Sequence, residues 1–128
     1  MSNVSYRIED HVLVIVAEQQ YTTGELRRVW ADAVASPTWS EVRGVLLDVR
    51  RSGSLLQRPV AQLRATTGYF AMELTKYDLP CVLLVDGAVR YGLMRMTTAW
   101  LPQGVRVRVF RDEGGALRWL ATMRAASG

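Results

Sequence analysis

Two aspartates are the residues of this sequence best placed to do chemistry together. Asp48 lies near the end of an apolar run at residues 45–49, and Asp86 directly follows a second apolar run at 81–85. If these runs are neighbouring parallel strands, both carboxylates reach the carboxyl edge of one sheet, where open α/β sheets often bind ligands. Two carboxylates held close together can donate and accept protons, so the pair is a candidate for acid and base chemistry.

An arginine stands close to each aspartate in the sequence. Arg50 follows Asp48 by two residues, and Arg90 follows Asp86 by four. Carboxylates in such places more often cap a helix or form a local ion pair than catalyse a reaction. We therefore favour capping or pairing with these arginines, and we interpret the four residues as a candidate ligand or partner site.

The loop after Asp48 carries two serines, Ser52 and Ser54, in the sequence R-R-S-G-S. Phosphate on either hydroxyl would lie near the expected start of a helix and near the arginines at 50, 51 and 58, surroundings that favour added negative charge. A Ser-Gly-Ser segment is also typical of a flexible turn, which is the interpretation we favour. We add Ser52 and Ser54 to the candidate ligand or partner site.

The other reactive side chains do not indicate an enzyme. His11 is the single histidine, and a lone histidine in a turn cannot complete a set of metal ligands. Cys81 lies in an apolar strand, where buried thiols are usually inert. The sequence lacks G-x-x-x-x-G-K-[ST], G-x-G-x-x-G after the first strand, and G-x-S-x-G. We predict a protein without enzymatic activity, cofactor or metal.

Composition and charge bound the class of protein. With 128 residues, 49% of them apolar and 22% charged, the chain is typical of one globular domain, so we expect a single domain over residues 1–128. Sixteen basic and twelve acidic residues give a net charge of +4, and all but one of the basic residues are arginine. Because the arginines are spread along the chain, nucleic-acid binding is not predicted.

The location is predicted from three features. The first ten residues have neither the basic start nor the apolar stretch of a secretory signal. The longest wholly apolar run has six residues, 12–17, whereas a membrane span needs about 20. With a single cysteine, these features predict a cytoplasmic protein without a membrane span.

Strand and helix patterns alternate along the chain. Apolar and polar residues alternate at 4–9, Asp10 and His11 form a polar turn, and 12–17 is apolar, so these segments predict an antiparallel hairpin. Further strands are expected at 45–49, 81–85 and 105–110, and helices over 23–35, 59–76, 88–101 and 113–123.

Single residues predict where the helices begin and which side they bury. Thr22 or Thr23 can cap the first helix, and Asp86 the third. The last helix is expected to turn Leu117, Leu120 and Met123 to one side.

Strands joined through helices must run parallel, with right-handed crossovers. The first and last strands each have a polar face, whereas the three between them are apolar on both faces, which suits a sheet in sequential order. We therefore predict an α/β fold: a mixed five-stranded sheet, antiparallel only at the first strand, with four main helices.

Four stretches of the sequence form a family pattern: S-Y-R-I-E-D-H-V-L-V-I-V, V-L-L-D-V-R, A-V-R-Y-G-L-M-R-M and V-R-V-R-V-F-R-D-E-G-G-A-L-R-W-L. They resemble the SpoIIAA-like proteins of the STAS and Sec14 (CRAL-TRIO) superfamily. Besides buried apolar positions, the matching residues are Asp48, Arg90, Gly92, Arg95, Phe110, Arg111, Asp112 and Trp119. The resemblance implies a right-handed superhelix of βα units with helices mainly against one face.

The antagonist branch of that superfamily carries Asp-x-Ser near the end of the third strand, then an Asp-Ser pair at the start of the next helix, whose serine a partner kinase phosphorylates. Asp48 matches the first position. Arg50 stands in place of the first serine, and residues 56–57, Leu-Gln, stand in place of the pair. The phospho-switch is therefore not expected at these positions.

The resemblance and the missing catalytic motifs favour a cytoplasmic regulatory or protein-interaction module. The alternative is a small carrier of an apolar ligand or lipid, as in the Sec14 branch. Three strands are apolar on both faces, and helices mainly on one side would leave part of the other face open. Because an open apolar patch normally marks a contact surface, we also expect self-association, most simply as a two-fold dimer.

Overall fold

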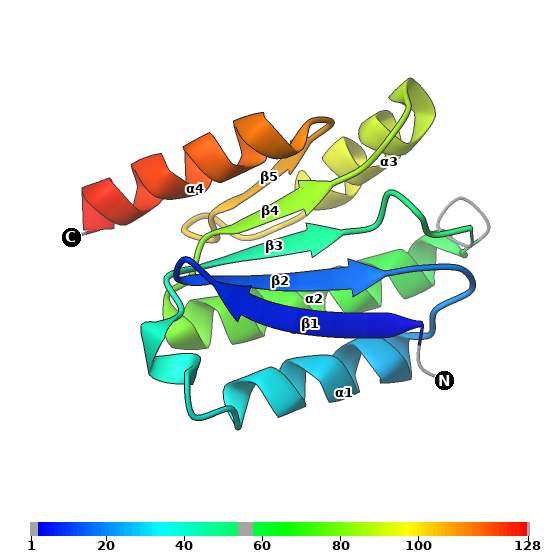
Figure 1. The fold of residues 1–128 in the computed structure, drawn as a ribbon. Coiled ribbons are helices and arrows are strands. Elements are labelled where there is room, and N and C mark those ends of the chain that lie inside the picture. Colours follow the sequence, from blue (N-terminus) through cyan, green and yellow to red (C-terminus); the bar gives the residue numbers. More distant parts are fainter. Residues whose placement is uncertain (1–2, 54–57, 128) are drawn as a thin grey trace.

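Five strands form one sheet in the order β1-β2-β3-β4-β5 (Figure 1). The computed structural model describes residues 3–53 and 58–127. The strands are β1 (Val4–Glu9), β2 (Val12–Ala17), β3 (Gly44–Asp48), β4 (Cys81–Leu84) and β5 (Val107–Phe110). β1 is antiparallel to β2, and every other pair of neighbours is parallel. This arrangement confirms the predicted mixed sheet in sequential order.

A helix follows each strand from β2 onward. The helices are α1 (Thr23–Val34), α2 (Val60–Tyr77), α3 (Ala88–Thr98) and α4 (Glu113–Ser127), and a short 3-10 helix, η1 (Trp39–Glu41), precedes β3. The four predicted main helices are therefore confirmed. α3 ends three residues before its predicted end, and α4 continues four residues beyond its own.

Local chemistry explains two of the boundaries. Asp10 and His11 both have positive φ, 52° and 66°, as a two-residue hairpin turn of type I′ requires. At the start of α1, the Thr22 hydroxyl accepts a hydrogen bond from the Glu25 amide, and the Glu25 carboxylate accepts one from the Thr22 amide. This capping box identifies Thr22, one of the two predicted candidates, as the cap.

Helices α1, α2 and α3 cover one face of the sheet, and their buried side chains share one core with it. The sheet contributes Leu13, Ile15 and Val45 to this core, and the helices contribute Trp30, Leu63 and Met94, among others. Most of the buried apolar surface therefore lies between these three helices and the sheet.

Helix α4 lies on the opposite face, above the sheet in Figure 1, where α1 and α2 lie below it. Its Ala116 and Leu120 are buried in a second core with apolar side chains from three strands: Val12, Val14, Leu46, Val82 and Leu84. We call these five residues the second sheet face. Because α4 covers this face, the expectation of an open apolar surface is wrong. The predicted two-fold dimer therefore loses the open sheet face as its support.

Two side chains differ from their predicted environments. Leu117 of α4 is exposed rather than buried with Leu120, because Ala116 and Leu120 form the inner side of the helix. Tyr6 of edge strand β1 is exposed although it lies on the same face of the strand as the inward-facing Val4 and Ile8. Among the described residues, no helix combines the length and the apolar character that crossing a membrane requires.

Candidate functional site

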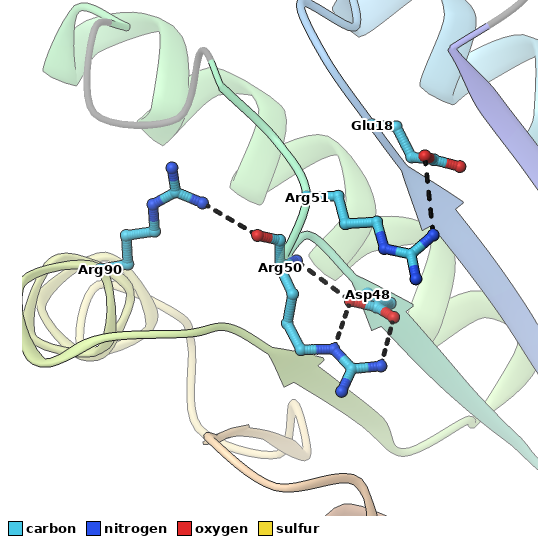
Figure 2. A network of polar contacts seen from close by, with 5 residues as sticks. All are labelled: Glu18, Asp48, Arg50, Arg51 and Arg90. Atoms are coloured by element: carbon cyan, nitrogen blue, oxygen red, sulfur yellow. Dashed lines mark hydrogen bonds and ion pairs between the residues drawn. The ribbon is translucent and has the colours of Figure 1, made fainter.

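Charged side chains gather where β2, β3 and β4 end, at the carboxyl edge of the sheet (Figure 2). We call Glu18, Asp48, Arg50, Arg51, Asp86 and Arg90 the carboxyl-end cluster. Glu18 directly follows β2, Asp48 is the last residue of β3, and Asp86 follows β4 by two residues. The structure thus brings four of the predicted site residues, Asp48, Arg50, Asp86 and Arg90, into one network.

Asp48 and Arg50 form a two-pronged ion pair. The Arg50 Nε lies 3.0 Å from Oδ1 of Asp48, its Nη2 lies 2.8 Å from Oδ2, and the Arg50 backbone amide also donates to Oδ1 at 3.0 Å. Burial opposes ionisation of the carboxyl group, but the hydrogen bonds from Arg50 and the charges of Arg50 and Arg51 outweigh it and hold the pKa of Asp48 below its usual value. Asp48 is therefore a fixed carboxylate with no proton to donate at neutral pH.

Replacing Asp48 with asparagine should make the protein less stable at neutral pH by about 1 kcal/mol, a modest value because Arg50 is partly exposed. The pKa of Asp48 is lower in the folded chain than the value of about 3.9 expected in the unfolded chain, so the ion pair stabilises the fold fully above that value. Its contribution is lost as the pH falls toward the folded-state pKa. Urea denaturation at several pH values between about 2 and 7 measures the difference.

The matched control is Asp32→Asn, at an exposed aspartate of α1 outside the cluster. It should leave the free energy of unfolding close to the wild-type value at every pH. A destabilisation by Asp48→Asn that stays constant down to the acid limit would contradict the ion-pair explanation.

Arg90 of α3 links the segment that follows β3 to the segment that follows β4. Its Nη1 donates to the Asp86 carboxylate at 3.3 Å and to the backbone carbonyl of Arg50 at 3.2 Å. The predicted pairing of Asp86 with Arg90 is thereby confirmed. The prediction that Asp86 caps α3 is wrong. The N-cap residue of α3 is Gly87, which has φ 77° and forms no side-chain capping hydrogen bond.

Residues 51–53, which follow β3, are held against the end of β2. Ser52 pairs with Gln19 in an isolated parallel bridge, and backbone hydrogen bonds join Gln19 to the Arg51 carbonyl and Gly53 to the Gln19 carbonyl. Ser52 is completely buried, so the flexible-turn interpretation is wrong there, and its hydroxyl is not exposed to a kinase in this structure. Ser54 and residues 56–57 lie outside the described residues.

Arg58, expected beside a phosphate, serves another contact. Its guanidinium lies 4.2 Å from the centre of the Tyr21 ring, and its Nη2 donates to the Tyr21 carbonyl. Burial raises the pKa of Tyr21 although the neighbouring cation favours the phenolate. Arg58 therefore ties the segment before α2 to the segment before α1.

The two remaining candidates for chemistry lie away from the cluster. Cys81 begins β4, at the opposite end of that strand from Asp86, and burial raises the pKa of its thiol to about 12. His11 lies in the β1–β2 turn, where Nδ1 donates to the Glu41 carbonyl at 3.0 Å. No three metal-binding side chains gather within the described part of the chain. The carboxyl-end cluster thus presents fixed charges, and the hydroxyl of the adjacent Ser52 is buried.

Sequence reasoning missed Glu18 and Arg51 as members of this cluster. Their side chains form a long ion pair, with Nη1 of Arg51 3.9 Å from Oε2 of Glu18. A signal was available, because Glu18 directly follows an apolar strand just as Asp86 follows β4. Three neighbouring strands therefore end close to a carboxylate, and each carboxylate has an arginine partner.

Comparison with known proteins confirms the fold. No protein-family model and no curated protein matches the chain. A serine-to-glutamate variant of RsbS from Moorella thermoacetica is similar in structure, with a TM-score of 0.65 and 15% identity over 97% of this chain and 99% of the other. An uncharacterised DUF3478-family protein from Shewanella loihica PV-4, described as having a SpoIIAA-like fold, gives a TM-score of 0.58 and 14% identity over 91% of each chain. The chain therefore has the predicted SpoIIAA-like fold.

Proposed function

We propose that this chain is a non-enzymatic regulatory module that binds another protein through its carboxyl-end cluster and the apolar side chains beside it. The observation that carries the proposal is Val89, which is 71% exposed in the first turn of α3 and directly precedes Arg90 of the cluster. Val60, in the first turn of α2, is also exposed at this end of the sheet. Protein interfaces place apolar side chains at their centre and polar or charged side chains around them.

The geometry of the cluster supports binding over catalysis. Arg90 binds the carbonyl of Arg50, Asp48 binds its amide, and Gln19 pairs with Ser52, so residues 50–52 are held in place before any partner arrives. A surface ordered in advance loses less conformational entropy on binding. The resemblance to the STAS superfamily, whose antagonist branch acts through protein partners, points the same way.

A photo-crosslinking amino acid placed at Val89 tests the proposal in cells of the source organism. We expect one discrete protein adduct, which Arg51→Glu should remove, because reversing an exposed charge of the cluster repels a complementary partner without disturbing the core. The matched control position is Met72 of α2, an exposed apolar helix residue at 73%. Absence of an adduct at Val89, or the same adduct at Met72, would contradict this surface.

A second candidate function is binding of a small apolar ligand. A groove of about 580 Å³ lies between α2 and the connection from α3 to β5, and apolar side chains line much of it: Ala71, Met72, Pro102 and Val105. Native mass spectrometry of protein purified from its own host separates the two candidates. A retained lipid mass would favour the ligand carrier, and the mass of the bare chain would favour the interaction module.

A further inference from the structure

A groove runs between α3 and the edge strand β5. One wall is a single stripe of α3, formed by Tyr91, Arg95 and Thr98 and continued by Ala99 just after the helix, and the other wall is β5. This part has a volume of about 310 Å³. A second hollow of about 330 Å³ shares Tyr91, Arg108 and Val109 with it and continues to Asp112. We call the two hollows together the β5 groove.

The wall of the groove that β5 forms has backbone groups available for pairing. β5 is the last strand of the sheet, so one of its sides has no neighbouring strand. On the other side, the amides of Cys81 and Val85 donate to the carbonyls of Arg106 and Phe110. Because alternate residues of a strand point their backbone groups to opposite sides, the amides and carbonyls of Val107 and Val109 point to the open edge.

Three arginines surround this open edge. Arg95 and Arg111 each place a guanidinium 5.9 Å from the centre of the Tyr91 ring, and that of Arg108 lies 5.4 Å from the centre of the Phe110 ring. None of the three belongs to an ion pair within the described residues. The carboxylate that borders the groove, Asp112, accepts the Gly115 amide at 2.6 Å at the start of α4. Three arginines and one carboxylate therefore line the groove, which gives it a net positive charge.

We propose that the β5 groove binds an extended acidic peptide segment of a partner, which adds to the sheet as a sixth strand. The open amides and carbonyls of Val107 and Val109 would pair with its backbone, and Arg95, Arg108 and Arg111 would bind its carboxylates. A second copy of β5 does not fit, because it would bring two arginine-bearing edges together. Charges on an edge strand discourage indiscriminate pairing, so the same arginines select an acidic strand over a neutral one.

This inference goes beyond the proposed function, since it names a second surface and the chemistry of its partner. It does not depend on Val89 or Arg51, the residues that test the carboxyl-end cluster. Failure of one proposal therefore leaves the other standing.

Fluorescence anisotropy with a fluorescein-labelled peptide of eight alternating glutamate and valine residues tests the β5 groove at about 0.15 M salt. We expect saturable binding, and Arg95→Glu and Arg108→Glu should each weaken it about tenfold or more, because each turns an attraction into a repulsion. Arg28→Glu, at an exposed arginine of α1, makes the same change of charge elsewhere and should weaken binding by less than about twofold. Circular dichroism verifies that all three variants remain folded.

Two further peptides separate strand addition from simple charge attraction. Replacing glutamate with glutamine should abolish binding, and methylating alternate backbone nitrogens should weaken it about tenfold or more, because the lost amides can no longer pair with the edge. In the ¹⁵N spectrum, the amides of Val107 and Val109 should shift on binding. Absence of binding, equal affinity for the methylated peptide, or equal affinity for a uridine oligonucleotide of the same charge would overturn the proposal.

Discussion

Replacing Trp30 with alanine is expected to lower the free energy of unfolding by about 3–5 kcal/mol. Trp30 is 1% exposed, and its indole lies among three other rings, with centroids 5.6 Å from Trp39, 5.7 Å from Phe70 and 6.4 Å from Tyr77. Its Nε1 also donates to the Glu73 carboxylate at 2.9 Å. Removing the indole leaves a cavity where α1, α2 and η1 meet, so three elements lose a shared contact.

This loss is a large fraction of the 5–15 kcal/mol that stabilises a typical domain. Urea denaturation followed by circular dichroism measures it, since the midpoint falls in proportion to the lost stability. The matched control is Trp100→Ala, because Trp100 is 36% exposed and its ring contacts Arg64 at 5.0 Å. We expect the control to lose less than about 1 kcal/mol. Equal losses in the two variants would mean that the ring cluster is not a centre of stability.

The sheet could be predicted from the sequence because its signals are local. The apolar runs at 12–17, 45–49 and 81–85 are each separated from the next strand by a helical pattern, and that order alone requires parallel neighbours. The ion pairs of the candidate site are local too, since Arg50 lies two residues from Asp48 and Arg90 lies four from Asp86. Such pairs follow from spacing along a strand end or a helix.

The contacts that sequence reasoning missed join residues far apart in the chain. The bond from Arg90 to the Arg50 carbonyl spans 40 residues, and the bridge that buries Ser52 reaches back to Gln19. No periodicity encodes either contact, because both depend on how the strand ends lie after the sheet has formed. For this reason the sequence indicates a flexible turn at Ser52, whereas the structure buries this residue.

The position of α4 is the largest difference between expectation and structure. Helical spacing showed that one side of this helix is apolar, but it does not say against which face of the sheet that side packs. Gly44 of β3 lies where α4 packs on the sheet. A Cβ at this position would lie 3.0 Å from Cδ2 of Leu120. The absence of a side chain at Gly44 leaves room for Leu120, which turns Ala116 inward and Leu117 outward.

Replacing Leu120 with alanine should therefore destabilise the protein by about 2–5 kcal/mol. Leu120 is 1% exposed and packs in the second core with Val12, Leu46 and Val82, among others. Leu117→Ala is the matched control, because it removes the same atoms from the same helix at a residue that is 42% exposed. We expect the control to change stability by less than about 1 kcal/mol, and a similar loss in both variants would show that α4 is not anchored by Leu120.

The same substitution should also change the state of association. When α4 is loosened, the second sheet face becomes exposed, and an apolar patch of more than a few hundred Å² is uncommon on a soluble monomer. At roughly 25 cal/mol per Å², covering such a patch with a second copy is favourable enough to offset much of the entropy lost on association. In sedimentation equilibrium, the average mass of Leu120→Ala should rise with protein concentration above that of both the wild type and Leu117→Ala. A mass that matches the wild type throughout would mean that α4 stays in place without Leu120, and that the helix is held by Ala116 and by the contact of Trp119 with Phe110 instead.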